Sequence, residues 1–345
     1  MSSRRRAVRE GAWRAVAAAL ATLGACLLLG LLGGCGGESA TTATREATLV
    51  LDFVPGPVHA GIYEALAKGY YEDEGIDLRV IEPTSTADTL KLIDAGKAEF
   101  GIADGLDVAG QIDAGRGAEA IMAIAQRPLG GVITLTESGF DSPKDLEGRR
   151  IGVTGVPSDD AILDAVVAAE GGDPAAVERV TIGFNGVQSL EAGKVDGFTG
   201  FIPADGVQAE ADGYPTTSFA PDEYGGLDYP GLVVFSTQQQ IADDPGLAAG
   251  FVAATVRGYE DVIADPGSGA DALLEANPAI DPEFAHASLQ AYLPLFTAGG
   301  RPFGTFDRHS IERMSDFMLD AGLIGDPIAP GRYATSEFVG TGDGD

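Results

Sequence analysis

Thr48-Leu-Val-Leu-Asp-Phe-Val-Pro-Gly-Pro-Val-His-Ala-Gly-Ile-Tyr-Glu-Ala-Leu-Ala-Lys-Gly-Tyr-Tyr-Glu-Asp-Glu-Gly75 is the stretch that decides the fold. It begins as a short apolar strand and breaks at Pro55-Gly-Pro57. It then continues as a helix, because four apolar residues recur at helical spacing: Val58, Ile62, Ala65 and Leu66. A strand that runs into a helix places the connecting loop at the carboxyl edge of a parallel sheet. We therefore expect Phe53 and His59 to face a ligand site.

The rest of the chain extends this strand and helix pattern. Short apolar strands alternate with helices, which predicts parallel α/β sheets. Gln126-Arg-Pro-Leu-Gly-Gly131 interrupts the alternation, and a second α/β series follows over residues 150–201. A strand at 231–237 predicts a return to the first series, after which residues 238–338 are largely helical. The sequence therefore predicts one α/β lobe inserted into another.

Three segments resemble the thiamine-pyrimidine-precursor family of periplasmic ABC-transporter solute-binding proteins. They are the opening stretch, Ser142 to Val153, and Leu190 to Gly197. The resemblance covers roughly residues 47–325. It implies an α/β, two-lobed type II periplasmic binding protein fold, in which a hinge closes the two lobes around a ligand.

The first 34 residues differ from the rest. Arginines precede an apolar run from Ala15 to Leu32, the layout of a secretory signal peptide. Leu32-Gly-Gly-Cys35 resembles a lipobox, which implies that Cys35 becomes the acylated first residue of a lipoprotein. An uncleaved membrane anchor is the alternative. The other expected parts are a flexible tether (residues 35–46), lobe 1 (47–129 and 237–338), lobe 2 (130–236) and a disordered tail (339–345).

Composition limits the partners. The sequence has 52 Asp and Glu against 22 Lys and Arg, a net charge of −30, which disfavours binding to nucleic acid or anionic lipid. Both cysteines, Cys26 and Cys35, lie in the N-terminal segment, so the mature body is expected to contain neither a thiol nor a disulfide. No metal or cofactor is predicted, because paired-cysteine spacing is missing and the histidines are far apart: His59, His286 and His309.

Several polar residues lie where strands end or lobes join. His59 is expected to be a neutral donor and acceptor, because it lies at the positive end of a helix dipole, or else to be merely packed or solvated. Asp104 is expected either to bind an exocyclic amine or to cap the next helix. Ser158 is predicted to be a helix N-cap or to rim the cleft. Gln126 and Arg127 precede the hinge, where Arg127 would contact the ligand or bridge the lobes.

The resemblance adds further positions. It places Asn185 in the cleft, and it implies that Phe201 and Asp205 supply a stacking ring and a carboxylate. Ile202 and Pro203 depart from the Trp and Asn that relatives carry, so stacking and hydrogen bonding are altered here. The full predicted ligand-binding set is Phe53, His59, Asp104, Gln126, Arg127, Ser158, Asn185, Phe201 and Asp205.

These observations predict an extracytoplasmic, lipid-anchored monomer without enzyme activity. It would bind a small heteroaromatic vitamin precursor, of the thiamine pyrimidine type, and deliver it to an ABC permease. Riboflavin, sulfonates and nitrate are alternatives on the same fold, although an anion needs cationic groups and Arg127 is the only obvious one. A pyrimidine synthase of the same fold is the rival enzyme, expected to use a His comparable to His59 with pyridoxal phosphate and a cysteine-rich iron motif. A receptor domain of a membrane sensor is a third alternative.

Overall fold

The computed structural model describes residues 44–297 and 300–339. The predicted signal peptide, Cys35 and most of the predicted tether and tail lie outside the described residues. Among the described residues, the helices are too short or too polar to span a membrane.

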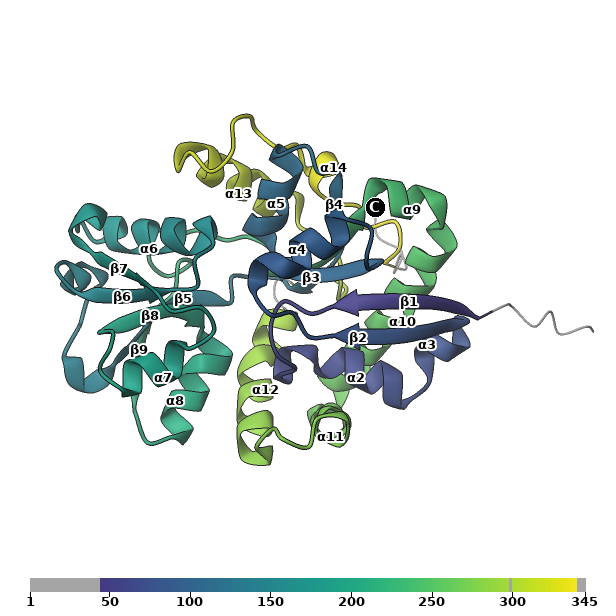
Figure 1. Ribbon diagram of the computed structural model, residues 1–345, viewed down its shortest axis with the longest axis horizontal. Coiled ribbons are helices and arrows are strands. Elements are labelled where there is room, and N and C mark those ends of the chain that lie inside the picture. The colour runs from purple at the N-terminus through teal and green to yellow at the C-terminus, as the bar shows by residue number, and fades with distance from the viewer. Residues whose placement is uncertain (1–43, 298–299, 340–345) are drawn as a thin grey trace, which may run out of the picture. The chain divides into compact units, whose positions relative to one another are not determined.

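Two five-stranded sheets organise the described chain (Figure 1). The first sheet has the order β2-β1-β3-β10-β4, with the bounds Ile76–Ile81, Arg45–Val50, Phe100–Asp104, Leu232–Thr237 and Ala118–Ala125. The second has the order β7-β6-β8-β5-β9, with the bounds Glu178–Thr181, Arg150–Val153, Gly197–Phe201, Gly130–Leu135 and Thr216–Phe219. We call the parts built on them the first and second lobes. The predicted α/β fold with two lobes is confirmed.

Both sheets are mixed, whereas the sequence predicted parallel sheets. In the first, β1 pairs in parallel with β2 and β3, but β10 is antiparallel to β3 and β4. The reason is topological, because β10 enters the first sheet from the second lobe and therefore from the opposite end. In the second, β6 pairs in parallel with β7 and β8, and β5 runs antiparallel to β8 and β9.

Helices cover the sheets. Those of the first lobe are α2 (Ala60–Ala67), α3 (Tyr70–Asp73), α4 (Thr86–Asp94), α5 (Gly105–Asp113), α9 (Gln238–Asp243), α10 (Pro245–Ala264), α11 (Pro266–Ala276), α12 (Pro282–Phe296), α13 (Arg308–Asp320) and α14 (Pro330–Tyr333). Those of the second lobe are α6, α7 and α8: Pro157–Ala169, Gly186–Glu191 and Val207–Ala211. Strand β4 is almost wholly buried, as expected for a strand with both faces covered.

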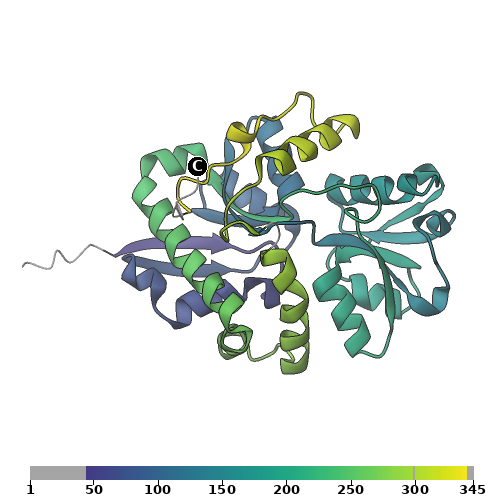
Figure 2. The same cartoon turned by 180° about the vertical axis from the view of Figure 1, so that it is seen from behind.

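The close crossing of α2 and α10 holds the loop that follows β1. A Cβ atom at Gly258 would lie 2.0 Å from the carbonyl oxygen of Gly61, so the two helices meet backbone to backbone. At the next residue of α10, the hydroxyl of Tyr259 donates to the carbonyl oxygen of Val58 at 2.7 Å. Figure 2 shows α10 running across the first lobe. The loop is thereby tied to the longest helix of the described chain.

Two connections join the lobes, one after β4 and one before β10. They touch each other, because a Cβ atom at Gly231 would lie 2.3 Å from the carbonyl oxygen of Arg127. The second crossing is complete before Leu232, since all of β10 pairs within the first sheet. The predicted lobe boundary at 236 and 237 therefore falls at the far end of this strand.

Replacing Gly258 should weaken the crossing of α2 and α10. We expect Gly258→Ala to lower the free energy of unfolding by about 1–3 kcal/mol, because the new methyl group has no room against the backbone of α2. Gly110→Ala in α5 is the matched control, since its Cβ atom would meet nothing within 4 Å. It should be neutral or stabilise by up to about 1 kcal/mol. Urea unfolding of both variants measures this, and equal effects would contradict the backbone contact.

Candidate functional site

A cavity of about 510 Å³ is lined by both lobes. The first lobe contributes the loop from Asp52 to His59, the end of β3 with the start of α5, and two side chains of α12. The second lobe contributes the segments that follow β6 and β7, β8 with the turn after it, and the start of β5. The cavity therefore lies beyond the carboxyl ends of parallel strands in both sheets, where open α/β folds bind their ligands.

His59 fixes the loop after β1. The imidazole is 1% exposed, and the backbone N–H of Gly56 donates to its Nδ1 at 3.1 Å. Because Nδ1 is an acceptor, the proton resides on Nε2, which donates to Oδ1 of Asp52 at 2.8 Å. His59 is thus neutral, as the sequence led us to expect. Both ring nitrogens are nevertheless bonded within the protein, so the ring holds the loop and leaves the cavity no free donor.

Asp104 fulfils the capping role that was one of its two predicted roles. Its Oδ1 accepts from the backbone N–H of Leu106 at 2.8 Å at the start of α5. Its Oδ2 accepts from the hydroxyl of Tyr229 at 3.1 Å. Burial, and then the neighbouring charge of Asp107, raise the pKa of Asp104 well above its ordinary value. The same carboxyl also lines the cavity.

Ser158 joins the lobes and does not cap α6. The helix begins at Pro157, whose fixed φ suits the first helical position, so Val156 is the N-cap and the predicted N-cap role is wrong. The hydroxyl of Ser158 instead donates to Oδ1 of Asp107 in α5 at 2.7 Å, and both groups are buried. Burial raises the pKa of Asp107 to about 7.

Asp159 brings a third carboxyl toward Asp104 and Asp107. It belongs to the second lobe and accepts from the backbone N–H of Thr154 at 2.7 Å. Burial raises the pKa of Asp159. The charge of Asp159 also raises the pKa of Asp104 and Asp107, so the closed lobes hold like charges near each other.

Phe201 and Asp205 lie together at the end of β8. The chain turns there through a π-helix, Ile202–Gly206, in which Oδ2 of Asp205 accepts from the backbone N–H of Phe201 at 2.7 Å. Burial raises the pKa of Asp205 to about 6. Both residues line the cavity, but Ile202 and Pro203 line a separate hollow. The two departures from the family pattern therefore face away from the cavity.

Three predicted residues do not line this cavity. Gln126 is buried and accepts from Arg301 at 3.4 Å. Arg127 forms an ion pair with Asp222 and borders the separate hollow. The side-chain amide of Asn185 donates to the carbonyl oxygen of Ile182 at 3.1 Å. The predicted residues that do line it are Phe53, His59, Asp104, Ser158, Phe201 and Asp205.

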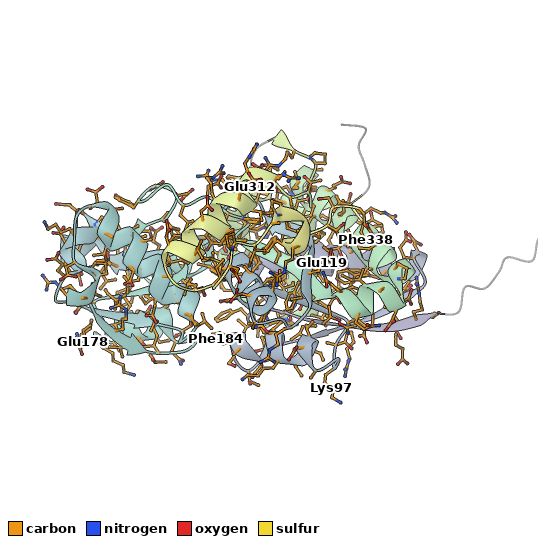
Figure 3. The ribbon with its side chains drawn as sticks, turned by 90° about the horizontal axis from the view of Figure 1, so that it is seen from above. Lys97, Glu119, Glu178, Phe184, Glu312 and Phe338 are labelled. Atoms are coloured by element: carbon orange, nitrogen blue, oxygen red, sulfur yellow. The ribbon has the colours of Figure 1, made fainter. Side chains whose placement is uncertain are left out.

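Sequence reasoning missed several cavity residues, above all Phe184. Its ring meets that of Phe53 with centroids 4.2 Å apart and planes at 66°, although the two belong to different lobes. Figure 3 shows Phe184 at the margin of the second lobe. The position next to Asn185 was the available signal. Asp107 could have been found from its place one turn after Asp104, and Tyr292 had no sequence signal.

The cavity is acidic and carries no formal positive charge. Among the described residues that line it, none is Lys or Arg and six are Asp: Asp52, Asp104, Asp107, Asp159, Asp205 and Asp212. No group of three His, Cys, Asp or Glu residues within the described ranges is arranged to hold a metal ion. The site therefore suits a ligand that donates hydrogen bonds and has no negative charge.

The sequence model described as NMT1/THI5 like matches residues 56–268. The chain belongs to this family. The formylaminopyrimidine-binding protein of Halalkalibacterium halodurans is 30% identical over 304 residues, which cover 86% of this chain and 92% of that protein. The 4-amino-5-hydroxymethyl-2-methylpyrimidine phosphate synthase of Legionella pneumophila is 28% identical over 257 residues, 73% of this chain and 80% of that protein.

The protein shares its fold with solved structures of other proteins. One is the ligand-binding component of an ABC-type import system from Staphylococcus aureus. It aligns with a TM-score of 0.67 over 85% of this chain and 97% of its own chain, at 10% sequence identity. The periplasmic aliphatic sulphonate binding protein SsuA of Escherichia coli aligns similarly, with a TM-score of 0.66 over 82% of this chain and 95% of its own chain at 10% identity. These likenesses establish a periplasmic binding protein fold.

The raised pKa of Asp107 gives a pH-dependent stability. A carboxyl whose pKa is higher in the folded state binds its proton more tightly there, so protonation stabilises the fold. This contribution is complete below the ordinary pKa of about 4, and it is lost as pH rises through the folded-state pKa of about 7. We expect Asp107→Asn to flatten the fall in unfolding free energy between about pH 4 and pH 7. The change should be about 1.4 kcal/mol for each unit by which the pKa is raised.

Asparagine can still accept from Ser158, so the lobe contact itself is retained in this variant. Asp316→Asn, at an exposed position of α13, is the control and should leave the pH profile unchanged. Denaturant unfolding across the pH range measures both. A wild-type slope in Asp107→Asn would refute the assignment.

Proposed function

We propose that the protein is the extracytoplasmic solute-binding component of an ABC importer, and that its cleft binds a thiamine pyrimidine precursor. The observation that carries this proposal is the cavity itself, where aromatic rings and six Asp side chains meet without any Lys or Arg among the described lining residues. Membership of the family, and the name of the Halalkalibacterium halodurans relative, support the pyrimidine assignment.

The chemistry of an aminopyrimidine matches this lining. Its exocyclic amine has two N–H donors, and the carboxyls of Asp104, Asp107 and Asp205 are acceptors available in the cavity lining. Its ring can pack against Phe53, Phe201 and other aromatic side chains of the cavity. Since a 510 Å³ cavity is within the usual range for small-molecule sites, a single substituted ring fits with room for its side group.

The same lining disfavours anions. A sulfonate or nitrate entering the cavity would lose its hydration among buried carboxyls and gain no cationic partner there. Arg127, the cation that sequence reasoning offered, pairs with Asp222 at the separate hollow. These features favour the pyrimidine over the sulfonate and nitrate alternatives.

An enzyme function has weaker support, although relatives named as synthases are in the family. A phosphate ester product would be an anion in an acidic cavity. No lysine of the described chain lines the cavity where it could form a Schiff base with pyridoxal phosphate. His59, the residue that the synthase hypothesis requires, holds the loop through both ring nitrogens. We therefore infer that the protein binds and releases its ligand without changing it chemically. We also propose that it is anchored to the membrane through Cys35.

A thermal-shift panel tests the ligand class. The purified protein should gain several degrees in Tm with 4-amino-5-hydroxymethyl-2-methylpyrimidine or its formylaminomethyl analogue, because ligand at about 1,000 times Kd stabilises by roughly 4 kcal/mol. Taurine and nitrate should produce no shift, since the cavity offers them no cation. A shift with taurine or nitrate alone would reject the pyrimidine assignment and keep the receptor fold. Consumption of pyridoxal phosphate together with loss of mass at His59 would instead support the synthase, which is expected to use up the comparable His as a donor.

Asp205→Asn tests the role of a single carboxyl. The amide oxygen can still accept from Phe201, so the π-helix is retained while the charge is removed. Affinity for the hydroxymethylpyrimidine should fall about tenfold or more, because a hydrogen bond to a charged group contributes roughly 1.5–3 kcal/mol. Glu210→Gln in α8, outside the cavity lining, is the matched control. Calorimetric titration measures both, and unchanged affinity in Asp205→Asn would place the amine elsewhere.

A further inference from the structure

Two aromatic side chains at the cleft belong to neither lobe's core. Phe53 and Phe184 both line the cavity and are only half-buried. Neither packs into the hydrophobic clusters that fill the described lobes. Their closest aromatic partner is each other, across the cleft, at a centroid distance of 4.2 Å. Because one ring comes from each lobe, the contact exists only while the lobes are closed.

The backbone holds the Phe184 ring in place. Gly183 has a φ of +56°, which turns the chain directly before Phe184. The turn is closed by Asn185, whose side-chain amide donates to the carbonyl oxygen of Ile182 at 3.1 Å. The backbone N–H of Ile182 is itself bonded to Val153 of β6 at 2.9 Å. The ring is therefore presented toward the first lobe by a turn attached to the second sheet.

A second contact between the lobes borders the same cavity. The hydroxyl of Ser158 in α6 donates to Asp107 in α5, and the bond is buried. A polar and an aromatic contact thus cross the cleft beside the cavity, in addition to the apolar packing of Phe201 and Ala204 against the core of the first lobe. The polar contact involves carboxyls already assigned to the ligand, whereas the aromatic contact has no role in the fold of either lobe.

The following inference rests on the proposed function. We propose that Phe184 is a ligand-retaining residue, whose ring closes on Phe53 over a bound pyrimidine and thereby sets the rate at which that pyrimidine dissociates. Entry takes place in the open form, in which the two rings are apart. Exit requires the lobes to separate and the ring contact to break. Loss of the contact should therefore appear in the dissociation rate and leave the association rate nearly unchanged.

Binding kinetics on the immobilised, full-length protein test this, with 4-amino-5-hydroxymethyl-2-methylpyrimidine as the probe. Phe184→Ala should raise koff about tenfold and change kon by less than about twofold, in line with the contribution of one aromatic pair. Phe53→Ala should raise koff as well. The double variant should fall short of the product of the two effects, because both remove the same contact. Tyr214→Ala, an exposed aromatic of the second lobe outside the cavity, should match the wild type.

The outcomes separate this inference from the proposed function. If the wild type binds the probe and Phe184→Ala has an unchanged koff, or shows its whole effect in kon, the retaining role is refuted and the binding function stands. If the wild type does not bind the probe, the proposed function fails. Solution X-ray scattering then tests, independently of ligand binding, whether the contact between the two rings holds the lobes closed. A larger radius of gyration in Phe184→Ala than in Tyr214→Ala supports the contact, and identical curves overturn it.

Discussion

The site depends on one buried imidazole. His59 accepts from the backbone of Gly56 and donates to Asp52, and in doing so it closes the loop between β1 and α2. Without it, a buried carboxylate and a backbone N–H would both lose their partners at the point where the first lobe meets the cavity. Tyr259 ties the same loop to α10. The Phe53 ring owes its position to this loop, since it follows Asp52 directly.

The second constraint is electrostatic. Carboxyls from α5 and α6 approach one another when the lobes meet, and burial raises their pKa values instead of a cation neutralising them. A protein selected for stability alone would separate such groups or pair them with Lys or Arg. Their proximity is therefore a cost to folding, and under the proposed function a ligand that donates hydrogen bonds would offset part of it.

The sequence allowed the α/β lobes, the opening strand and helix, and six of the cavity residues to be predicted, because strand ends and glycine or proline breaks are local signals. Two kinds of feature had no such signal. Strand β9 was missed because Thr-Thr-Ser-Phe is short and does not alternate, and it forms through pairing with β5. Tyr292 was missed because it lies on a distant helix. Phe184 was missed, although it lies next to Asn185, because its aromatic partner belongs to the other lobe. For Ser158, only the N-cap role was wrong, and its bond to Asp107 could not be foreseen because it joins residues 51 positions apart.

The contact between the two connecting segments, at Gly231 and Arg127, limits how the lobes can move. Because the two connecting segments lie side by side, we expect the lobes to open by rotation about one axis, with little freedom to slide or twist. Under the proposed function, a single opening angle would then describe both capture and release of the ligand. Side chains around the cavity can change to suit another solute while that angle, and the faces that a membrane partner would recognise at each end of it, stay the same.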